Sequence, residues 1–328
     1  MQVFLTGATG FIGGVVAAKL VERGDNVKAL VRSPEKAGAL AELGCDLIQG
    51  SLSDEHVIQA AMVGCDAVIH GAAVYSVGIA EKDRGAMFDA NVRGTERVLR
   101  AVLRTEVPRV VYVSTVNAFG DTGGVVVDEG YEHTERYVSY YDETKHKAHR
   151  IAKILVSEHG LPGVIVQPGL VYGPNDTSEM GNLMRMYIRK RMPVKILPTT
   201  GVTACYVDDV ADGIVLALDK GRIGESYVLG GEVTRSGEIF DTLASLMGRK
   251  PQRFTLPVGM MKASAPVARF INPVLGFPPN MREMISAGHN VTYWASCDKA
   301  RKELGYSPRS LEQGLKDMLT AEGLVPSS

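Results

Sequence analysis

One turn near the amino terminus constrains the fold more than any other feature of this chain. The β-branched run Gln2–Thr6 is followed by Gly7, Gly10 and Gly13, and then by a helical pattern over Phe11–Arg23. Glycines permit a tight turn and a close backbone approach, and the helix start presents free N–H groups that can hold a pyrophosphate. Three glycines are weak evidence in a chain with 36 of them, but after a first strand and at a helix start they have the required context. The turn therefore predicts a dinucleotide-binding site.

The first 170 residues alternate short β-branched runs with longer helical patterns such as Ala86–Thr105, which is typical of a parallel sheet covered by helices. The expected strands are Gln2–Thr6, Asn26–Val31, Asp46–Gln49, Ala67–His70, Arg109–Ser114 and Gly163–Gln167. After Pro168 the pattern loosens, and a Met-rich helical segment is expected over Val258–Ile285. We therefore expect an α/β fold, a Rossmann-type doubly wound parallel sheet in residues 1–170 with returning segments near 203–230. Residues 171–328 are expected to form mainly a smaller substrate-binding cap.

The charge balance argues against partners that need a cationic surface. Lysines and arginines number 36 and aspartates and glutamates 37, so the formal net charge is −1. There is no overall basic excess to hold nucleic acid or anionic lipid, although the net charge does not exclude a small local basic patch. The cysteines show no close pair, which excludes a zinc knuckle and a disulfide framework by spacing and predicts reduced thiols. They are Cys45, Cys65, Cys205 and Cys297.

The apolar segments predict a protein that does not enter a membrane. The first strand-like run begins at Gln2 and leaves no room for a secretory leader. A bilayer-spanning helix needs about 20 uninterrupted apolar residues. The segment Pro257–Phe277 comes closest, but Lys262 and Arg269 interrupt it. We expect a cytoplasmic protein with a small-molecule substrate, no membrane partner and no nucleic-acid partner.

The end of the second expected strand indicates which dinucleotide is preferred. An acid about 20 residues beyond the glycines would bind the adenosine ribose hydroxyls. Here no acid appears before Glu35; instead, Arg32 offers a planar fork suited to a 2′-phosphate, and Ser33 could add a hydroxyl. The sequence therefore favours NADP(H) over NAD(H), with a solvated surface arginine as the alternative reading of Arg32.

A tyrosine and a lysine form the candidate proton-transfer pair. Tyr141 and Lys145 share one helix face at a spacing of four residues, so the ammonium is expected to lower the pKa of the phenol. The spacing alone is weak, because twelve tyrosines give roughly half a chance match per chain, but its place after the fifth expected strand strengthens it. That strand ends in Ser114 and Thr115, which alternate across it, so one hydroxyl should point into the site.

Several motifs in order carry a family resemblance. They are Gly7–Gly13, His70–Ala73, Asn91–Thr95, Tyr141–Lys145, Gln167–Pro174, Tyr206–Val210 and Asp298–Pro308. With them the chain resembles the extended short-chain dehydrogenases/reductases of the NAD-dependent epimerase/dehydratase family, and is most similar to the dihydroflavonol-4-reductase-like branch. The resemblance implies that Tyr141 is the acid/base and that Lys145 assists it and binds ribose. It also selects Thr115, five residues before Gly120, as the catalytic hydroxyl.

The same resemblance implies further site residues. Asn91 would support the lysine through water. The cofactor would be lined by Gly7, Thr9, Gly10, Phe11, Ile12, Gly13, Arg32, Ser51, Leu52, Ala72, Ala73, Tyr141, Lys145 and Pro168. Four positions depart from the family pattern. Leu170 stands where nucleotide-sugar epimerases usually carry Asn, and Gln167 stands where an Arg is common. Ser51 replaces the usual adenine-contacting Asp, and His149 stands where a Glu often follows the tyrosine and lysine. The helices Ala86–Thr105 and Val138–Ser157 resemble those that pair across the family's homodimer.

Three other candidates have plainer interpretations. His146 and His149, three residues apart, could be metal ligands, but we expect a solvated helix face. Asp208 and Asp209 are expected to cap and start a helix, and His70 to be structural. The leading hypothesis is an NADP(H)-dependent carbonyl reductase or alcohol dehydrogenase. The alternatives are a nucleotide-sugar epimerase or dehydratase that retains NAD, which Leu170 disfavours, and a dinucleotide-sensing regulator without chemistry, which the intact Tyr141, Lys145 and Thr115 disfavour.

Overall fold

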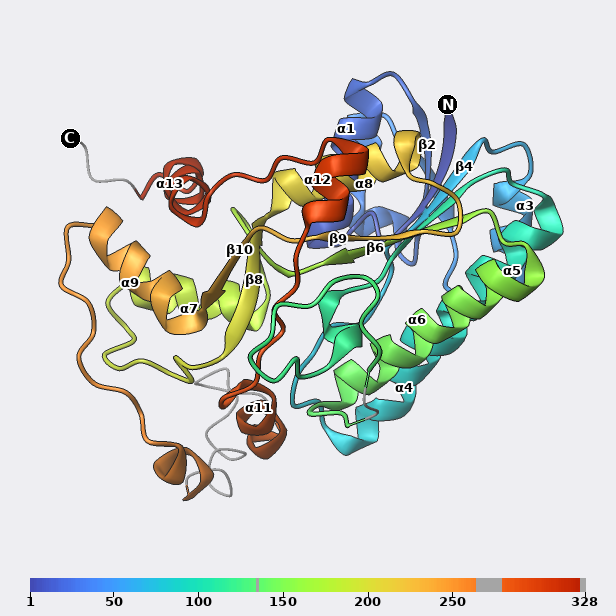
Figure 1. Cartoon of the computed structure of the whole chain (residues 1–328). Coiled ribbons are helices and arrows are strands. Elements are labelled where there is room, and N and C mark those ends of the chain that lie inside the picture. Colours follow the sequence, from blue (N-terminus) through green and yellow to red (C-terminus); the bar gives the residue numbers. More distant parts are fainter. Residues whose placement is uncertain (134–135, 264–278, 325–328) are drawn as a thin grey trace.

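A seven-stranded parallel sheet forms the core of the computed structural model, which describes residues 1–133, 136–263 and 279–324 (Figure 1). Its strand order is β3-β2-β1-β4-β5-β6-β9, all parallel. The strands are β1 Gln2–Thr6, β2 Asn26–Val31, β3 Asp46–Gln49, β4 Ala67–His70, β5 Val110–Val113, β6 Gly163–Pro168 and β9 Ser226–Leu229. The first four match the predicted bounds, whereas β5 is one residue shorter at each end and β6 one residue longer. The Rossmann-type fold is confirmed.

Helices cover both faces of this sheet because apolar side chains alternate along its strands. In β1, Val3 and Leu5 pack in one buried cluster and Phe4 packs in another. The first face carries α1 Phe11–Glu22, α2 Gly38–Leu43, α8 Val207–Lys220 and α12 Asp298–Leu304. The second face carries α3 Glu55–Met62, α5 Gly94–Thr105 and α6 Tyr140–His159.

The helix expected over Ala86–Thr105 is divided into three parts. The α-helix α4, Arg84–Phe88, continues into a π-helical turn over Asp89–Arg93 before α5 begins at Gly94. A π turn inserts an extra residue and is frequent at functional sites. It turns the Asn91 side chain inward, where it is 1% exposed.

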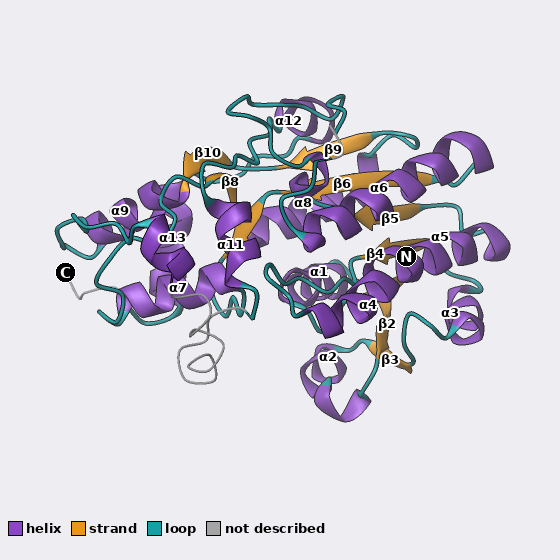
Figure 2. Cartoon of the chain, turned by 90° about the horizontal axis from the view of Figure 1, so that it is seen from below, coloured by secondary structure: helices purple, strands orange, loops and turns teal. Residues whose placement is uncertain are grey.

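A smaller lobe, the cap, is built around a three-stranded sheet in the order β10-β8-β7. Its strands are β7 Leu170–Tyr172, β8 Gly201–Tyr206 and β10 Glu232–Arg235. Its helices are α7 Glu179–Ile188, α9 Ser236–Leu246, α11 Met281–Gly288 and α13 Leu311–Ala321. Figure 2 shows the cap helices gathered at one end of the molecule, with α11 on the side toward the core. The Met-rich helix expected over Val258–Ile285 is not continuous: residues 258–263 are helical, 279–280 are not, and 264–278 lie outside the described residues.

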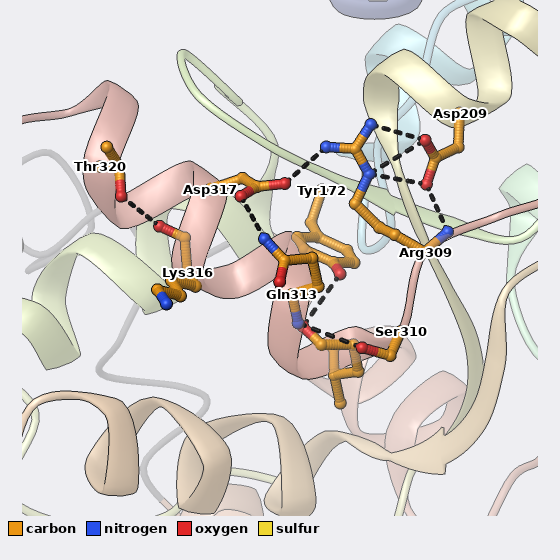
Figure 3. A network of polar contacts seen from close by, with 9 residues as sticks. Tyr172, Asp209, Arg309, Ser310, Gln313, Lys316, Asp317 and Thr320 are labelled. Carbon is orange, nitrogen blue, oxygen red and sulfur yellow. Dashed lines mark hydrogen bonds and ion pairs between the residues drawn. The ribbon is translucent and has the colours of Figure 1, made fainter.

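The chain crosses between core and cap several times. Arg309, on the last of these crossings, binds acids on both sides of it, Asp209 on α8 of the core and Asp317 on α13 of the cap (Figure 3). Arg309, between α12 and α13, donates from Nη2 and Nε to the Asp209 carboxylate on α8 at 2.7–3.0 Å. Its Nη1 donates to Asp317 on α13 at 2.6 Å. Asp208 and Asp209 lie in the first turn of α8, as predicted, but the prediction that they cap the helix was wrong, since the N-cap is Tyr206 without a side-chain cap. The buried Asp209 serves a partner 100 residues away instead.

No helix within the described ranges is both long and apolar enough to span a membrane.

Candidate active site

The glycine turn after β1 is shaped so that only glycine fits. Gly7 adopts a positive φ of 84°, and a Cβ there would lie 2.7 Å from the Ala72 nitrogen. A Cβ on Gly13 would collide with the Gly7 carbonyl oxygen. Helix α1 starts with no side-chain cap at Gly10 and no acid in its first turn. The turn therefore leaves uncapped N–H groups at the positive end of a helix, which fits a dinucleotide pyrophosphate.

The other expected cofactor residues lie at the carboxyl ends of the strands around this turn. Thr9 and Ala73 are exposed, Phe11, Ile12 and Ala72 are half-buried, and Pro168 is buried at the end of β6. Ligands of open α/β sheets bind at this edge. The arrangement thus brings the predicted cofactor residues to one edge of the sheet.

Two further expected contacts lie nearer the outer strands. Leu52 packs so closely on α5 that a Cβ at Gly94 would be 2.8 Å from its Cδ1. The Ser51 hydroxyl donates a hydrogen bond to the Asp54 carboxylate at 2.8 Å. An acid therefore lies three residues beyond Ser51, the position where the family pattern has an adenine-contacting Asp. Arg32 is exposed after β2, and none of the described residues binds its guanidinium. Its cationic fork remains free for a ligand.

Tyr141 lies in the first turn of α6, almost wholly buried at 6% exposure. Its ring meets the edge of Tyr75, from the loop after β4, with the centroids 4.9 Å apart. Burial raises the pKa of the Tyr141 phenol well above its usual range, and the nearby Tyr75 and Asp142 raise it further. A hydrogen bond with the Thr115 side chain acts in the opposite direction. Tyr141 and Thr115 therefore come together as the sequence predicted.

Lys145 lies one turn further along α6 and is also buried. Its Nζ donates to the Val113 carbonyl oxygen at 3.3 Å and lies 5.4 Å from the centre of the Tyr112 ring. Burial lowers the pKa of Lys145 to about 8. The expected lowering of the Tyr141 pKa by this ammonium does not prevail here, because desolvation of the phenol under Tyr75 dominates.

The two hydroxyls that follow β5 point in different directions, as strand alternation predicted. Thr115 Oγ1 accepts from the Asn117 N–H at 3.2 Å and lies 3.4 Å from the Pro168 oxygen, beside Tyr141. Ser114 Oγ instead meets His149 Nδ1 at 3.0 Å beneath α6. Thr115 is therefore the hydroxyl that faces the site.

Asn91 supports the site through the backbone rather than through Lys145 directly. Its Oδ1 accepts from the Val74 N–H at 2.7 Å, and its Nδ2 donates to the Val74 oxygen and the Thr144 hydroxyl, both at 3.0 Å. These bonds hold the loop that carries Tyr75 against the helix that carries Tyr141. A water that links Asn91 to Lys145 stays a prediction.

Sequence reasoning missed a chain of hydrogen bonds that runs from Thr115 into the cap. Asn117 Nδ2 donates to Asp142 Oδ1 at 2.9 Å, and the Tyr293 hydroxyl donates to Asp142 Oδ2 at 3.0 Å. Asp142 is fully buried, and this burial raises the pKa of its carboxyl to about 6 despite these donors. The sequence signal for Asp142 was its position directly after Tyr141. Its two partners lie 25 and 151 residues away in the sequence, so the network itself could not be inferred.

The prediction that His146 and His149 face solvent was wrong. Both are buried, at 8% and 9% exposure, because this face of α6 packs on the turn Val116–Phe119 and on the end of β5. His146 Nδ1 binds the Ala118 oxygen at 3.0 Å. No three His, Cys, Asp or Glu side chains of the described ranges are grouped to hold a metal. His70 is fully buried between the Thr6 and Thr95 hydroxyls, in line with a structural role.

Comparisons with known proteins identify the family and the fold. A sequence model of the NAD dependent epimerase/dehydratase family matches residues 3–230. A putative dihydroflavonol 4-reductase of Synechocystis sp. is 33% identical, over 96% of this chain and 92% of that protein. The 4-hydroxy-2-methyl-3-oxo-4-farnesyl-3,4-dihydroquinoline-1-oxide ketoreductase of Stigmatella aurantiaca is 31% identical, over 98% and 97%. The UDP-glucuronic acid 4-epimerase of Bacillus cereus, solved with UDP-glucuronic acid and NAD, shares the fold with a TM-score of 0.78 at 22% identity, covering 98% of each chain.

Proposed function

The chain belongs to the NAD-dependent epimerase/dehydratase family, an extended short-chain dehydrogenase/reductase with NAD(P)-dependent oxidoreductase chemistry, and from that premise we propose that it reduces a carbonyl group with NADPH. The observation that carries the proposal is the convergence of Tyr141 and Thr115 beside buried Lys145 at the edge of the sheet where the glycine turn lies. The reverse reaction, oxidation of the corresponding alcohol, uses the same groups.

The chain's own residues divide the work. A bound nicotinamide supplies the hydride in the forward direction and accepts it in the reverse. Thr115 donates a hydrogen bond to the substrate oxygen and orients it. Tyr141 transfers its phenolic proton to that oxygen, and the Lys145 ammonium, held by the Val113 carbonyl, stabilises the phenolate left behind. The same ammonium also binds the nicotinamide-ribose hydroxyls.

The raised pKa of Tyr141 supports this direction of proton transfer. In its buried position the Tyr141 phenol holds its proton at neutral pH, as a general acid must before it donates. The positive charge of the Lys145 ammonium favours the phenolate form of Tyr141, and this form is the one that starts the reverse reaction. Tyr75, whose ring covers the phenol, would be displaced by the substrate or would pack against it.

The cofactor preference rests on Arg32. Its exposed guanidinium follows the strand where an acid would otherwise bind the ribose hydroxyls. A guanidinium binds a 2′-phosphate with charge-assisted hydrogen bonds, which NADPH offers and NADH lacks. We therefore propose NADPH as the preferred cofactor.

The decisive experiment replaces Tyr141 by Phe. Wild type is first assayed by NADPH absorbance against a panel of aldehydes, ketones, steroids and sugar nucleotides. Tyr141→Phe removes only the hydroxyl, so cofactor binding should survive and turnover should fall by ~10²–10⁴, the range for a lost general acid. Lys145→Ala should damage both.

Tyr140→Phe is the matched control, because Tyr140 directly precedes Tyr141 on α6 and its ring packs under Arg84, 4.9 Å from the guanidinium carbon. It should keep its activity. A dead Tyr140→Phe with an active Tyr141→Phe would refute the assignment. Wild type that binds NADPH but is inert toward the whole panel would favour the dinucleotide-sensing alternative.

The second candidate is a nucleotide-sugar epimerase or dehydratase, the activity named for the structural relative above. Leu170, at the start of β7, places an apolar side chain where such enzymes usually carry an Asn. This substitution favours a substrate without a nucleotide diphosphate. The ketoreductase name of the Stigmatella relative points the same way.

We also propose a homodimer that pairs through α5 and α6. Both helices lie on one face of the core and carry exposed outer residues, among them Arg93 on the π turn before α5 and Ile154 on α6, which is 40% exposed. Light scattering at micromolar concentration tests this. A single species of about 35 kDa, the mass of one chain, would contradict it.

A further inference from the structure

The cap contains two segments whose charge differs sharply from that of the whole chain. Residues 180–207 hold five lysines and arginines and no acid, although the chain overall has slightly more acids than bases. Residues 242–263 hold four more and again no acid. Such an excess of one sign, concentrated in one lobe of a nearly neutral protein, is invisible in the net charge.

The two segments lie side by side in the structure. Arg249 Nη1 donates to the Ile188 oxygen at 2.9 Å, and Gln252 donates its amide to the Met192 oxygen. The Lys195 N–H donates to the Phe254 oxygen at 2.8 Å. The segment after α9, orange in Figure 1, runs along the outer edge of the cap toward the helical turn at 258–263.

Most of the cations on these segments have no protein partner. Lys195 pairs with Asp241, Arg249 binds backbone oxygens and Arg185 donates to the Asn182 oxygen, so these three have partners within the fold. Six others are exposed, and none of the described residues forms a side-chain hydrogen bond or ion pair with them. They are Arg189, Lys190, Arg191, Lys250, Arg253 and Lys262. These cations are available to an outside partner.

Two large apolar side chains are exposed on the second of these segments. Phe254 is 74% exposed, the highest value among the large apolar residues described, and Met260 is 61% exposed. We call the six cations, Phe254 and Met260 together the cap-tip patch. Exposed aromatic and sulfur side chains among unpaired cations combine the two features of an interfacial membrane anchor, apolar insertion and attraction to anionic headgroups.

We propose that the cap-tip patch docks peripherally on an anionic phospholipid surface. Nucleic acid offers the same phosphate charge, but it gives Phe254 and Met260 no apolar medium to enter, so the combination favours lipid. The patch amends the expectation from net charge that the chain has no lipid partner. No spanning helix is required for this binding.

The patch is joined through α11 to the start of α6, the helix that carries Tyr141. Met261, next to Met260, packs with Met281 and Ile285 of α11. On the same helix, Glu283 Oε1 accepts from the N–H of Tyr140, the residue before the proposed proton donor, at 2.6 Å. A docked cap tip would therefore hold α11, and with it the start of α6, close to the bilayer. The relevance of this placement to catalysis rests on the proposed function, whereas docking itself does not.

Vesicle co-sedimentation of the full chain tests the proposal without any substrate. Wild type is mixed at low salt with phosphatidylcholine vesicles, or with vesicles containing about one third phosphatidylglycerol. We expect pelleting with the anionic vesicles only and release in 0.5 M NaCl, since salt screens the attraction. Each cation near an anionic leaflet strengthens binding about fivefold, so a Lys190→Gln, Lys250→Gln, Arg253→Gln variant should bind roughly 100-fold more weakly.

Matched controls separate the patch from charge in general. Lys153→Gln, Lys302→Gln, Lys316→Gln removes the same charge from exposed positions on α6, α12 and α13 and should bind like wild type. Phe254→Ser should weaken binding, whereas Ile223→Ser, at a residue 55% exposed near the core, should not. Wild type that stays in the supernatant, a control triple as weak as the patch triple, or a preference for a duplex oligonucleotide over vesicles would each overturn the proposal.

Discussion

Replacing Asp142 by Asn should change how the stability of the protein depends on pH. The carboxyl of Asp142 is fully buried, and burial raises its pKa from 3.8 to about 6. A folded-state pKa above the unfolded one means that the folded protein holds the proton more tightly. The stabilisation is therefore complete below pH 3.8 and is lost as the pH rises through 6.

The structure sets the size of the effect. A gap of about two pKa units corresponds to about 3 kcal/mol, of which roughly 2 kcal/mol is lost between pH 4.5 and 7.5. An Asn at this position can keep the network, because its oxygen can accept from Asn117 while its amide donates to the Tyr293 hydroxyl. Tyr293 can then turn its own proton to the Ala287 oxygen, 3.4 Å away. The variant thus removes the titration while keeping the contacts.

Urea unfolding of wild type and Asp142→Asn between pH 4.5 and 7.5 measures this. The free energy of unfolding of wild type, minus that of the variant, should fall by about 2 kcal/mol across the range. Asp46→Asn, at an exposed carboxyl on β3, should give a flat difference. A flat difference for Asp142→Asn, or one that rises with pH, would refute the reasoning about burial.

Three further substitutions probe the Arg309 ion pairs, the glycine turn and the exposed Arg32. Arg309→Met should lower the free energy of unfolding by about 3 kcal/mol, since it leaves the Asp209 carboxylate, only 8% exposed, without its cation, whereas Asp317→Asn should cost under about 1 kcal/mol. Gly13→Ala should abolish dinucleotide binding in a fluorescence titration, and Gly14→Ala, whose added Cβ would lie 3.5 Å from the nearest atom, should preserve it. Arg32→Asp should weaken NADPH by about 1.5–3 kcal/mol and spare NADH; tighter binding of NADH than NADPH by wild type would contradict the assigned preference.

The sheet could be predicted from the sequence because its determinants are local. Short β-branched runs and the glycine turn fixed the first four strands, and a spacing of four residues placed Tyr141 and Lys145 on one helix face. Strand alternation likewise separated Ser114 from Thr115. Each of these inferences needs only neighbouring residues and a helix or strand period.

The features that the sequence did not reveal depend on distant partners. The π turn holds Asn91 against the Val74 backbone, 17 residues away. The sequence around His146 and His149 is typical of a solvent-facing helix surface, but the turn Val116–Phe119 packs over it. Asp209 resembles an ordinary first-turn acid, yet its partner is Arg309. Periodicity assigns a polar residue to a helix face, but it does not say whether that face meets water or another part of the chain.

The repeated crossings between core and cap bear on how such a protein can acquire a new specificity. The chain leaves the core after β6, returns with α8 and β9, leaves again with β10, and comes back with α12 before α13 completes the cap. An exchange of residues 171–328 with a relative would therefore replace one core strand and two core helices along with the cap. Recombination at a single junction near residue 171 would keep Arg23 but take position 219 from the relative. It would break the 2.7 Å ion pair between Arg23 and Asp219 whenever the relative has no acid at that position. Under the proposed function, substitutions in the loop that carries Tyr75 would alter the surroundings of Tyr141 and leave all of these core contacts in place.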